Sequence, residues 1–423
     1  MESEQSKEVM DGRKPVICVV GGGNASHVLI PYFSSKGHTV TVFAGHSDEA
    51  KRLSEAMAKH GGITVFDRCN PKNIREYKGK PDMISRDPRN VVPQADIVVM
   101  ALPSFAFRPV LKQIKAHLKD GAIVFGMPGQ GGLDLVSRSI LGQDLDSGRV
   151  TVAGLIPMPL NCRIMEWGKS VDLASIKDSY DVAAVPAKNA SMAAEVCTAL
   201  FDRPARALSH YCAMALHASN PNIHPARLYG LFSDFKEGKV YSENPLFYET
   251  FDDKSAAWVS KVSDERLKIW KAVVRKSNGK AGRNDEVPDI KSYIIGIYGK
   301  QIHDSRTVAS VFSTNDGFKG FRCPMKKVEE GAQQGWTLDF NNRYFTEDIP
   351  EGFCVYKGIA DLAGVETPVI DEILGFFQKF MGKEYLVKGK LIGADVRDTK
   401  APQAFGITTL EQYLRIGSFA MSG

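Results

Sequence analysis

The chain has 423 residues, and this length favours two domains because a single hydrophobic core rarely grows beyond about 250–300 residues. Its 54 basic and 49 acidic residues leave a net charge of +5, which does not favour a nucleic-acid partner but is compatible with an anionic substrate or cofactor. Seven scattered cysteines without a CxxC pair argue against a disulfide framework and structural zinc, and no apolar run approaches the roughly 18 residues of a membrane helix. We therefore expect a cytoplasmic, two-domain protein with neither a membrane nor a nucleic-acid partner.

The first elements in chain order have the pattern of a strand, a glycine turn, a helix and a second strand. Residues 16–20 are apolar without alternation, as in a parallel strand that is buried on both faces. Three glycines follow, and we expect a helix over 24–35 and a strand over 39–44. A dinucleotide pyrophosphate needs such a turn, because backbone N–H groups must approach it closely and the helix N-terminus adds a partial positive charge.

This turn supplies the predicted cofactor-binding residues. They are Gly21, Gly22, Gly23, Asn24, Ala25 and Ser26. We expect Gly21 to make the tight turn, Gly23 to admit the pyrophosphate and Ser26 to replace the usual third glycine at the helix–strand contact. A purely structural glycine turn is the alternative. Gly45 and His46 stand where an acidic residue would hold the ribose, so this segment leaves NAD and NADP open.

The alternation of strands and helices continues through 95–118 and 121–141 and into a strand near 150–159. Ligands of open α/β sheets lie beyond the carboxyl ends of the strands, which places the loops 102–107 and 126–132 beside the cofactor. Gln130 is the polar side chain of the second loop. It is a candidate contact to nicotinamide or substrate, with an ordinary loop role as the alternative. We predict an α/β Rossmann domain with a parallel sheet over residues 13–203.

The second half has helical rather than α/β patterning. Apolar residues recur at helical spacing in 209–235, 252–274 and 367–382, and the glycine turn is not repeated. We predict a mainly α-helical second domain over 204–423 that carries the substrate and catalytic residues, with residues 313–321 as a candidate lid.

The stretch NPNIHP at 220–225 places a histidine between two prolines. Because both prolines interrupt a helix, we expect His224 at a rigid, irregular boundary between elements. The residues alone leave a structural role and an acid–base role open for it. His210 and His217 do not predict a metal site, because histidine ligands on one helix usually lie about three or four residues apart and no Asp or Glu completes a set.

Three motifs occur in a specific order: GGGN at 21–24, NPNIHP at 220–225 and NRYFTEDIP at 342–350. Together they resemble the opine dehydrogenase family, the octopine and nopaline dehydrogenases, and its animal members in particular. The resemblance extends from about residue 15 to 420. The stretch GLIPMPLNCR at 154–163 is also similar, although Leu160 stands where a tryptophan is expected, which alters the predicted pocket floor.

This resemblance implies an NAD(P)H-dependent reductive condensation. An L-amino acid is joined to pyruvate or another 2-oxo acid to give a secondary amine dicarboxylate, and NAD⁺ is regenerated for anaerobic glycolysis. Position by position, His224 matches the catalytic histidine, Asp348 its carboxylate partner and Arg343 the anchor of the keto acid, with Glu347 as an alternative carboxylate. These residue types suit the chemistry, since histidine transfers protons near neutral pH and arginine grips a carboxylate bidentately. NAD(H) is favoured by the animal members, and NADP(H) remains open.

Two other functions remain as alternatives. One is a two-domain Rossmann dehydrogenase acting on a 2-hydroxy acid, ketopantoate or glycerol phosphate, whose catalytic base is more often a lysine. The other is a catalytically silent NAD(H)-sensing protein. No motif identifies the amino-acid substrate, and a monomer is expected with a homodimer as the alternative.

Overall fold

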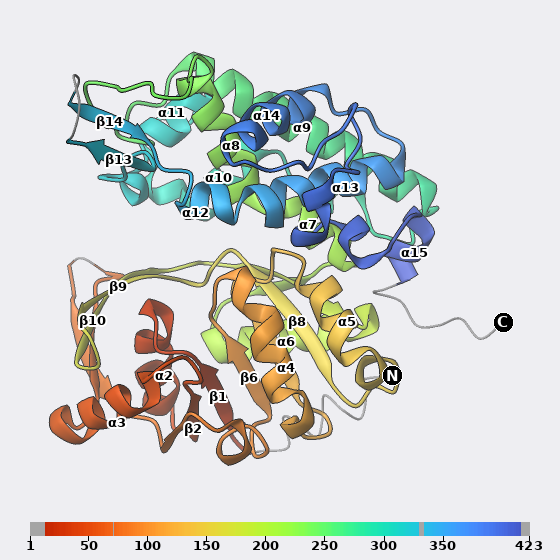
Figure 1. Cartoon of the computed structure of the whole chain (residues 1–423). Helices are drawn as coiled ribbons and strands as arrows, with labels where there is room; N and C mark the ends of the chain where they lie inside the picture. Colours follow the sequence, from red (N-terminus) through yellow and green to blue (C-terminus); the bar gives the residue numbers. More distant parts are fainter. Residues whose placement is uncertain (1–12, 71, 330–333, 416–423) are drawn as a thin grey trace. The chain divides into compact units, whose positions relative to one another are not determined.

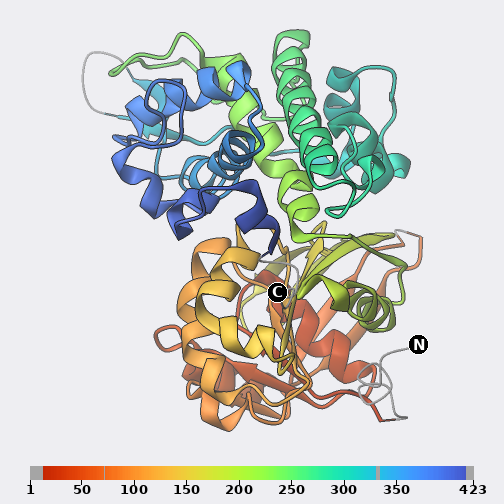
Figure 2. The ribbon, with the colours of Figure 1, turned by 90° about the vertical axis from the view of Figure 1, so that its right-hand side faces the viewer.

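The computed structural model describes residues 13–70, 72–329 and 334–415 (Figures 1 and 2). The chain divides into two compact units: residues 1–214 with 415–423, and residues 215–414. The predicted boundary was 203/204. Strand β12 (Ala205–Ala207) pairs with β11 (Tyr180–Val185), and the Tyr211 hydroxyl donates to the Gly129 carbonyl at 2.7 Å. Residues 205–214 therefore complete the first unit.

The first unit is built on an eight-stranded sheet with the order β12-β11-β8-β7-β6-β1-β2-β5. The other strands are β1 (Ile17–Val20), β2 (Val40–Phe43), β5 (Met83–Ser85), β6 (Ile97–Met100), β7 (Ile123–Gly126) and β8 (Thr151–Ile156). Strands β5, β2, β1, β6, β7 and β8, which are neighbours in this order, are all parallel, whereas β11 is antiparallel to β8. Their order β5-β2-β1-β6-β7-β8 is the Rossmann order 3-2-1-4-5-6. The predicted Rossmann domain is confirmed, with an antiparallel extension at one edge.

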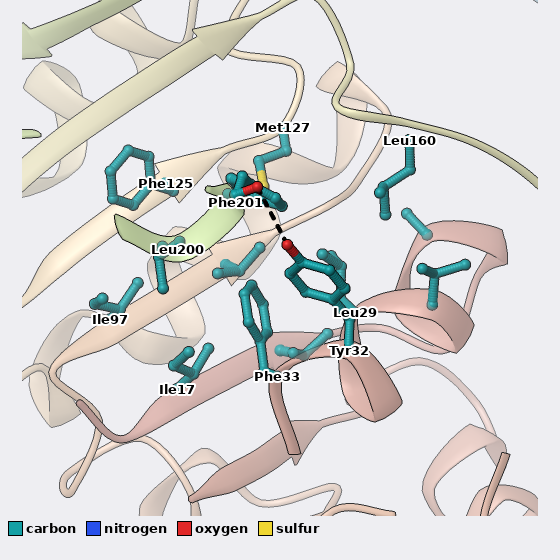
Figure 3. Close-up of a cluster of buried hydrophobic side chains, with 14 of the residues drawn as sticks. Ile17, Leu29, Tyr32, Phe33, Ile97, Phe125, Met127, Leu160, Leu200 and Phe201 are labelled. Atoms are coloured by element: carbon teal, nitrogen blue, oxygen red, sulfur yellow. Dashed lines mark hydrogen bonds between the residues drawn. The ribbon is translucent and has the colours of Figure 1, made fainter. Parts of the chain in front are cut away.

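Helices cover both faces of this sheet (Figure 2). They are α2 (Asn24–Ser35), α3 (Glu49–His60), α4 (Phe107–Ile114), α5 (Leu133–Asp146) and α6 (Ala190–Phe201). Figure 3 shows the core on the α2 and α6 side, where Ile17, Phe33 and Phe201 lie together and the Tyr32 hydroxyl donates to the Phe201 carbonyl at 3.3 Å. Fully burying one such side chain contributes about 1.5–3 kcal/mol, so this core fixes the helix that follows the glycine turn.

A second sheet in the first unit was not predicted. Its order is β4 (Arg75–Gly79), β3 (Ile63–Asp67), β10 (Ser170–Ile176) and β9 (Leu160–Glu166). Helix α2 contacts both sheets, and Val65, Val171 and Leu173 join its hydrophobic core. Leu160, which was expected to shape a pocket floor, begins β9 as a 5% exposed member of this core (Figure 3).

The second unit is mainly helical, as predicted (Figure 1). Its helices are α8 (Ser219–Phe232), α9 (Asp253–Lys276), α10 (Ile290–Tyr298), α11 (Val308–Ser313), α12 (Arg343–Thr346), α13 (Cys354–Ala363) and α14 (Pro368–Phe380), while α7 (Tyr211–His217) and α15 (Leu410–Arg415) span the unit boundaries. Strands β13 (Met325–Val328) and β14 (Gly335–Leu338) form an antiparallel pair. Helix α9 is central, because it contacts α8, α10, α11, α13 and α14. Within the described ranges, no helix combines the length and hydropathy of a membrane span.

Candidate functional site

The glycine turn of the first unit has the conformation that a dinucleotide pyrophosphate requires. Gly21 has φ +86°, a region that favours glycine, and its N–H donates to the Phe43 carbonyl at 2.9 Å. A Cβ built on Gly23 would meet no atom within 4 Å, so open space lies beside the backbone just before α2. The exposed turn, the open space and the helix N-terminus together fit a bound phosphate group.

The remaining predicted cofactor residues have different surroundings. Ser26 is 1% exposed and its hydroxyl lies 3.5 Å from the Val20 carbonyl, so it occupies the helix–strand contact expected of the third glycine. Ala25 is buried in the same core. The Asn24 side chain accepts a 2.8 Å hydrogen bond from the backbone N–H of Ile164, which ties the start of α2 to β9. Asn24 therefore offers a ligand its backbone more readily than its side chain.

Gln130 lies on the loop that follows β7, at the carboxyl end of the parallel strands. The loop is held rigidly, because the Gly129 N–H donates to the Leu155 carbonyl at 2.9 Å. A Cβ on Gly129 would stand 2.3 Å from the Cα of Gly154, so the two backbones are in close contact. Gln130 itself is partly exposed on this fixed loop.

His224 lies inside a helix, and the predicted irregular boundary is wrong. Helix α8 runs from Ser219 to Phe232 through both prolines. Pro221 occupies the first turn, where no backbone N–H is needed, and Pro225 forgoes only the hydrogen bond to the Pro221 carbonyl. The tertiary contacts of α8 outweigh that loss. Its Asn222 side chain, for example, donates to the Val259 carbonyl of α9 at 3.0 Å.

The structure brings His224 and Asp348 together although 124 residues separate them. The Nδ1–H of His224 donates to Oδ2 of Asp348 at 2.7 Å, and the two residues are 5% and 8% exposed. Burial raises the pKa of the Asp348 carboxyl above its usual value, and the neighbouring imidazole opposes part of that rise. A carboxylate bound to Nδ1 orients the ring and leaves Nε2 as the nitrogen that can transfer a proton.

Aromatic residues enclose the imidazole on its other sides. The Tyr344 ring stacks on His224 with centroids 3.8 Å apart and an angle of 12°, and Phe247 contacts it edge-on at 5.4 Å. The Tyr248 hydroxyl lies 3.0 Å from Nε2 and also forms a hydrogen bond with the Tyr344 side chain. Phe318, from the segment predicted as a lid, stacks on Tyr248 at 4.2 Å and is itself buried. The chain Asp348–His224–Tyr248–Tyr344 is therefore a buried hydrogen-bonded network.

Sequence reasoning missed Tyr248 and Tyr344. Tyr344 lies inside the NRYFTEDIP motif beside Arg343, so the motif carried a signal for it, whereas nothing in the sequence singled out Tyr248. Its position is set by Arg227, one turn beyond His224 on α8, which is 0% exposed and donates from Nε to the Phe247 carbonyl at 3.0 Å. Helix α8 thus carries His224 and, through Arg227, also fixes the loop that brings the Tyr248 hydroxyl to Nε2 of His224.

Close packing also holds Asp348 near α8. Asp348 immediately precedes the π-helical turn η8 (Ile349–Phe353), and the Phe353 N–H donates to its carbonyl at 2.8 Å. A Cβ on Gly352 would lie 2.1 Å from Cγ of Pro221, so η8 lies directly against the first turn of α8. Only glycine at 352 allows this approach.

The two adjacent carboxylates, Glu347 and Asp348, have different partners. Arg343 begins α12, and its Nε donates to Glu347 at 2.6 Å while 68% of its side chain stays exposed. Asp348, not Glu347, pairs with His224. Glu347, the alternative carboxylate, therefore pairs with Arg343. The exposed guanidinium of Arg343 lies on the same short segment as Asp348.

Across the residues that the structure describes, no group of three or more His, Cys, Asp or Glu side chains is arranged to hold a metal ion.

A Rossmann-type dinucleotide site in one unit and a buried His–Asp pair with a nearby exposed arginine in the other define the class of NAD(P)-dependent two-domain dehydrogenases. Residues 207–381 match the family model of the NAD/NADP octopine/nopaline dehydrogenase α-helical domain. Residues 16–132 match the NAD-dependent glycerol-3-phosphate dehydrogenase N-terminus, so that second similarity is confined to the dinucleotide-binding part.

Curated relatives match nearly the whole chain. The tauropine dehydrogenase of Arabella iricolor is 35% identical over 94% of this chain and 100% of its own. The octopine dehydrogenase of Pecten maximus is 32% identical over 94% and 98%. A solved octopine dehydrogenase in complex with NADH and agmatine has a TM-score of 0.85 at 30% identity and covers 97% of this chain and 100% of its own. The chain belongs to the opine dehydrogenase family and is an NAD(P)H-dependent oxidoreductase.

Proposed function

We propose that this enzyme condenses an amine, in the first place an L-amino acid, with pyruvate and reduces the product with NADH to a secondary amine, which is a dicarboxylate when the amine is an amino acid. The observation that carries the proposal is the buried 2.7 Å pair of His224 and Asp348 on the chain segments that also present Arg343. The relatives support it, since one solved structure is octopine dehydrogenase with NADH and pyruvate, at 30% identity and a TM-score of 0.83.

The chemistry requires one proton besides the hydrogens of the amine. The amine nitrogen attacks the keto carbon of pyruvate, the keto oxygen leaves as water with the two hydrogens that the amine nitrogen gives up, and the resulting C=N bond takes up a hydride at carbon and a proton at nitrogen. NADH supplies the hydride. His224, protonated at Nε2, donates the proton, and the Asp348 carboxylate stabilises the imidazolium through Nδ1. The Tyr248 hydroxyl accepts the Nε2–H hydrogen bond until the proton is transferred.

The other proposed residues bind and orient. The exposed guanidinium of Arg343 grips the carboxylate of the keto acid, because a planar fork of N–H donors fixes the carbonyl carbon in one orientation. In the first unit, the turn from Gly21 to Ser26 holds the pyrophosphate, and Gln130 contacts nicotinamide or substrate.

The cellular compartment and the oligomeric state of the enzyme are also part of the proposal. We place it in the cytoplasm, where its seven cysteines, all free, stay reduced and where recycling of NAD⁺ sustains anaerobic glycolysis. We propose a monomer, because few large hydrophobic side chains of the described residues are exposed.

A substrate panel tests the proposal directly. NADH oxidation is followed with pyruvate and each of a set of amines that includes arginine, alanine, glycine and taurine. We expect one amine to raise the rate at least about 100-fold over pyruvate alone. Full turnover with pyruvate alone, or with dihydroxyacetone phosphate alone, would instead support another dehydrogenase class.

A further inference from the structure

The carboxyl end of β2 lacks the acidic side chain that usually binds the adenosine ribose. In dinucleotide-binding sheets, an Asp or Glu near this point accepts hydrogen bonds from the ribose hydroxyls. Here Ala44 and Gly45 follow the strand. A Cβ on Gly45 would lie 2.7 Å from Cζ of Phe43 and 3.1 Å from Oε1 of Gln113, so a side chain at this position would displace both of these groups. A carboxylate that binds the ribose would therefore come from another residue.

Glu49 places a carboxylate beside the glycine turn. It is the first residue of α3, and its own N–H donates to the His46 carbonyl at 3.1 Å, which fixes the start of the helix. Its Oε1 lies 2.8 Å from the point where a Cβ on Gly22 would stand. The Gly22 backbone N–H donates a hydrogen bond to this carboxylate. The side chain is therefore held in a defined orientation over the turn that receives the nucleotide.

The surroundings of Glu49 distinguish it from its acidic neighbour. Glu49 is partly buried, and burial raises the pKa of its carboxyl while the Gly22 N–H lowers it. The Asp48 side chain is 60% exposed and lies 3.7 Å from the guanidinium of Arg52. Of these two carboxylates, Glu49 is the one placed at the turn.

Positive charges lie further out on the same side. Lys51 and Arg86 line a surface pocket together with Ser47, Asp48 and Ala50, and Arg86 immediately follows β5, the neighbour of β2. These cations would favour the 2′-phosphate of NADP(H), whereas a carboxylate at the turn repels it. The choice of cofactor thus depends on which charge lies against the ribose.

We propose that Glu49 accepts the hydrogen bonds of the 2′- and 3′-hydroxyls of the adenosine ribose and thereby selects NADH over NADPH. The carboxylate has a fixed orientation and lies directly at the turn, while Lys51 and Arg86 lie on the flank. A phosphate on the 2′-oxygen would both remove one donor and bring two negative charges against Glu49. The proposal rests on the dinucleotide site alone and not on the amine chemistry.

Nucleotide binding measured without pyruvate or amine tests it. Dissociation constants for NADH and NADPH are obtained by fluorescence titration for the wild type, for Glu49→Gln and for the control Glu195→Gln, which changes an exposed glutamate on α6 of the same unit. Glu49→Gln keeps the shape of the side chain, and we expect it to weaken NADH binding at least about tenfold and to tighten NADPH binding. Glu195→Gln is expected to change both constants less than about twofold.

Two results would overturn the proposal. One is unchanged NADH affinity in folded Glu49→Gln, and the other is an equal effect of Glu195→Gln. The wild type provides a check that needs no variant, because it must bind NADPH at least about tenfold more weakly than NADH. None of these measurements depends on turnover, so failure of the proposed condensation would leave them unaffected.

Discussion

The two units present their functional groups in contrasting ways. In the first, the groups proposed to hold the pyrophosphate are backbone atoms of the glycine turn, and a hydrophobic core behind them fixes the turn. In the second, the groups proposed to carry the chemistry belong to side chains from α8, from the loop that contains Tyr248 and from the start of α12 to η8. Substitutions that add atoms should therefore impair the first arrangement, whereas substitutions that remove side-chain atoms should impair the second.

The largest effect is expected for His224→Ala in the second unit. Loss of the proton donor should lower kcat by about 10³–10⁴-fold, and the NADH dissociation constant should stay within about twofold because the first unit is untouched. Single-turnover kinetics and a nucleotide titration separate the two quantities. Retained turnover would show that His224 is not the proton donor.

Asp348→Asn should lower kcat by about 10³-fold, since the amide cannot stabilise the imidazolium.

The same substitution should make the folded protein more stable at pH 7. Burial raises the pKa of Asp348, so the folded state disfavours the ionised carboxylate, and the free energy of unfolding falls as pH rises through the folded-state pKa. The variant lacks this cost. Calorimetry should therefore give it the higher thermal midpoint at pH 7, with the difference shrinking toward pH 4; a lower midpoint at pH 7 would contradict this account.

Arg343→Ala should raise the KM for pyruvate by about 100-fold with a smaller change in kcat, because the anchor acts in the ground state and the transition state alike. Arg343→Lys is the matched variant. It keeps the charge but loses the bidentate fork, and we expect it to recover only part of the affinity. Equal KM values for Arg343→Ala and the wild type would place the pyruvate carboxylate elsewhere.

Gly23→Ala tests the first unit by adding an atom. Because a Cβ here meets no protein atom within 4 Å, the variant should fold with an unchanged thermal midpoint. The methyl group enters the space assigned to the pyrophosphate, so NADH binding should weaken by about 10–30-fold. Gly142→Ala, within α5 and equally free of contacts, is the control and should bind NADH like the wild type.

The smallest effect is expected for Tyr248→Phe. It deletes only the hydroxyl that lies 3.0 Å from Nε2, and kcat should fall by about three- to tenfold while the KM for pyruvate is kept. Parallel measurement of kcat and KM checks this. A loss as large as that of His224→Ala would make Tyr248 itself the proton donor.

The parts of the fold that follow from local sequence were predicted well. The glycine turn and its helix obey local rules, and the predicted helix over 24–35 coincides with α2 (Asn24–Ser35). The second sheet was missed, because strand β9 carries exposed polar residues and its neighbour β10 pairs with β3, which lies far earlier in the chain. Pairing of that kind leaves no local pattern to detect.

The residues of the site were likewise predicted only in part. His224, Asp348 and Arg343 were predicted through motif resemblance, and the structure brings the first two into contact. Their local context was less predictable: Pro221 and Pro225 suggested a break where tertiary packing maintains a helix. Tyr248 was not predicted, since only the buried Arg227 and the fold of its loop bring its hydroxyl to the imidazole.

The contact between Pro221 and Gly352 has an evolutionary consequence. Neither residue has a reactive group, yet their close approach sets the spacing between the helix that bears His224 and the turn that follows Asp348. A side chain gained at 352 would separate the acid–base pair while every residue of that pair stayed unchanged. Any side chain at 352 therefore requires a change at 221, and activity can be lost by mutation at a position without a reactive group.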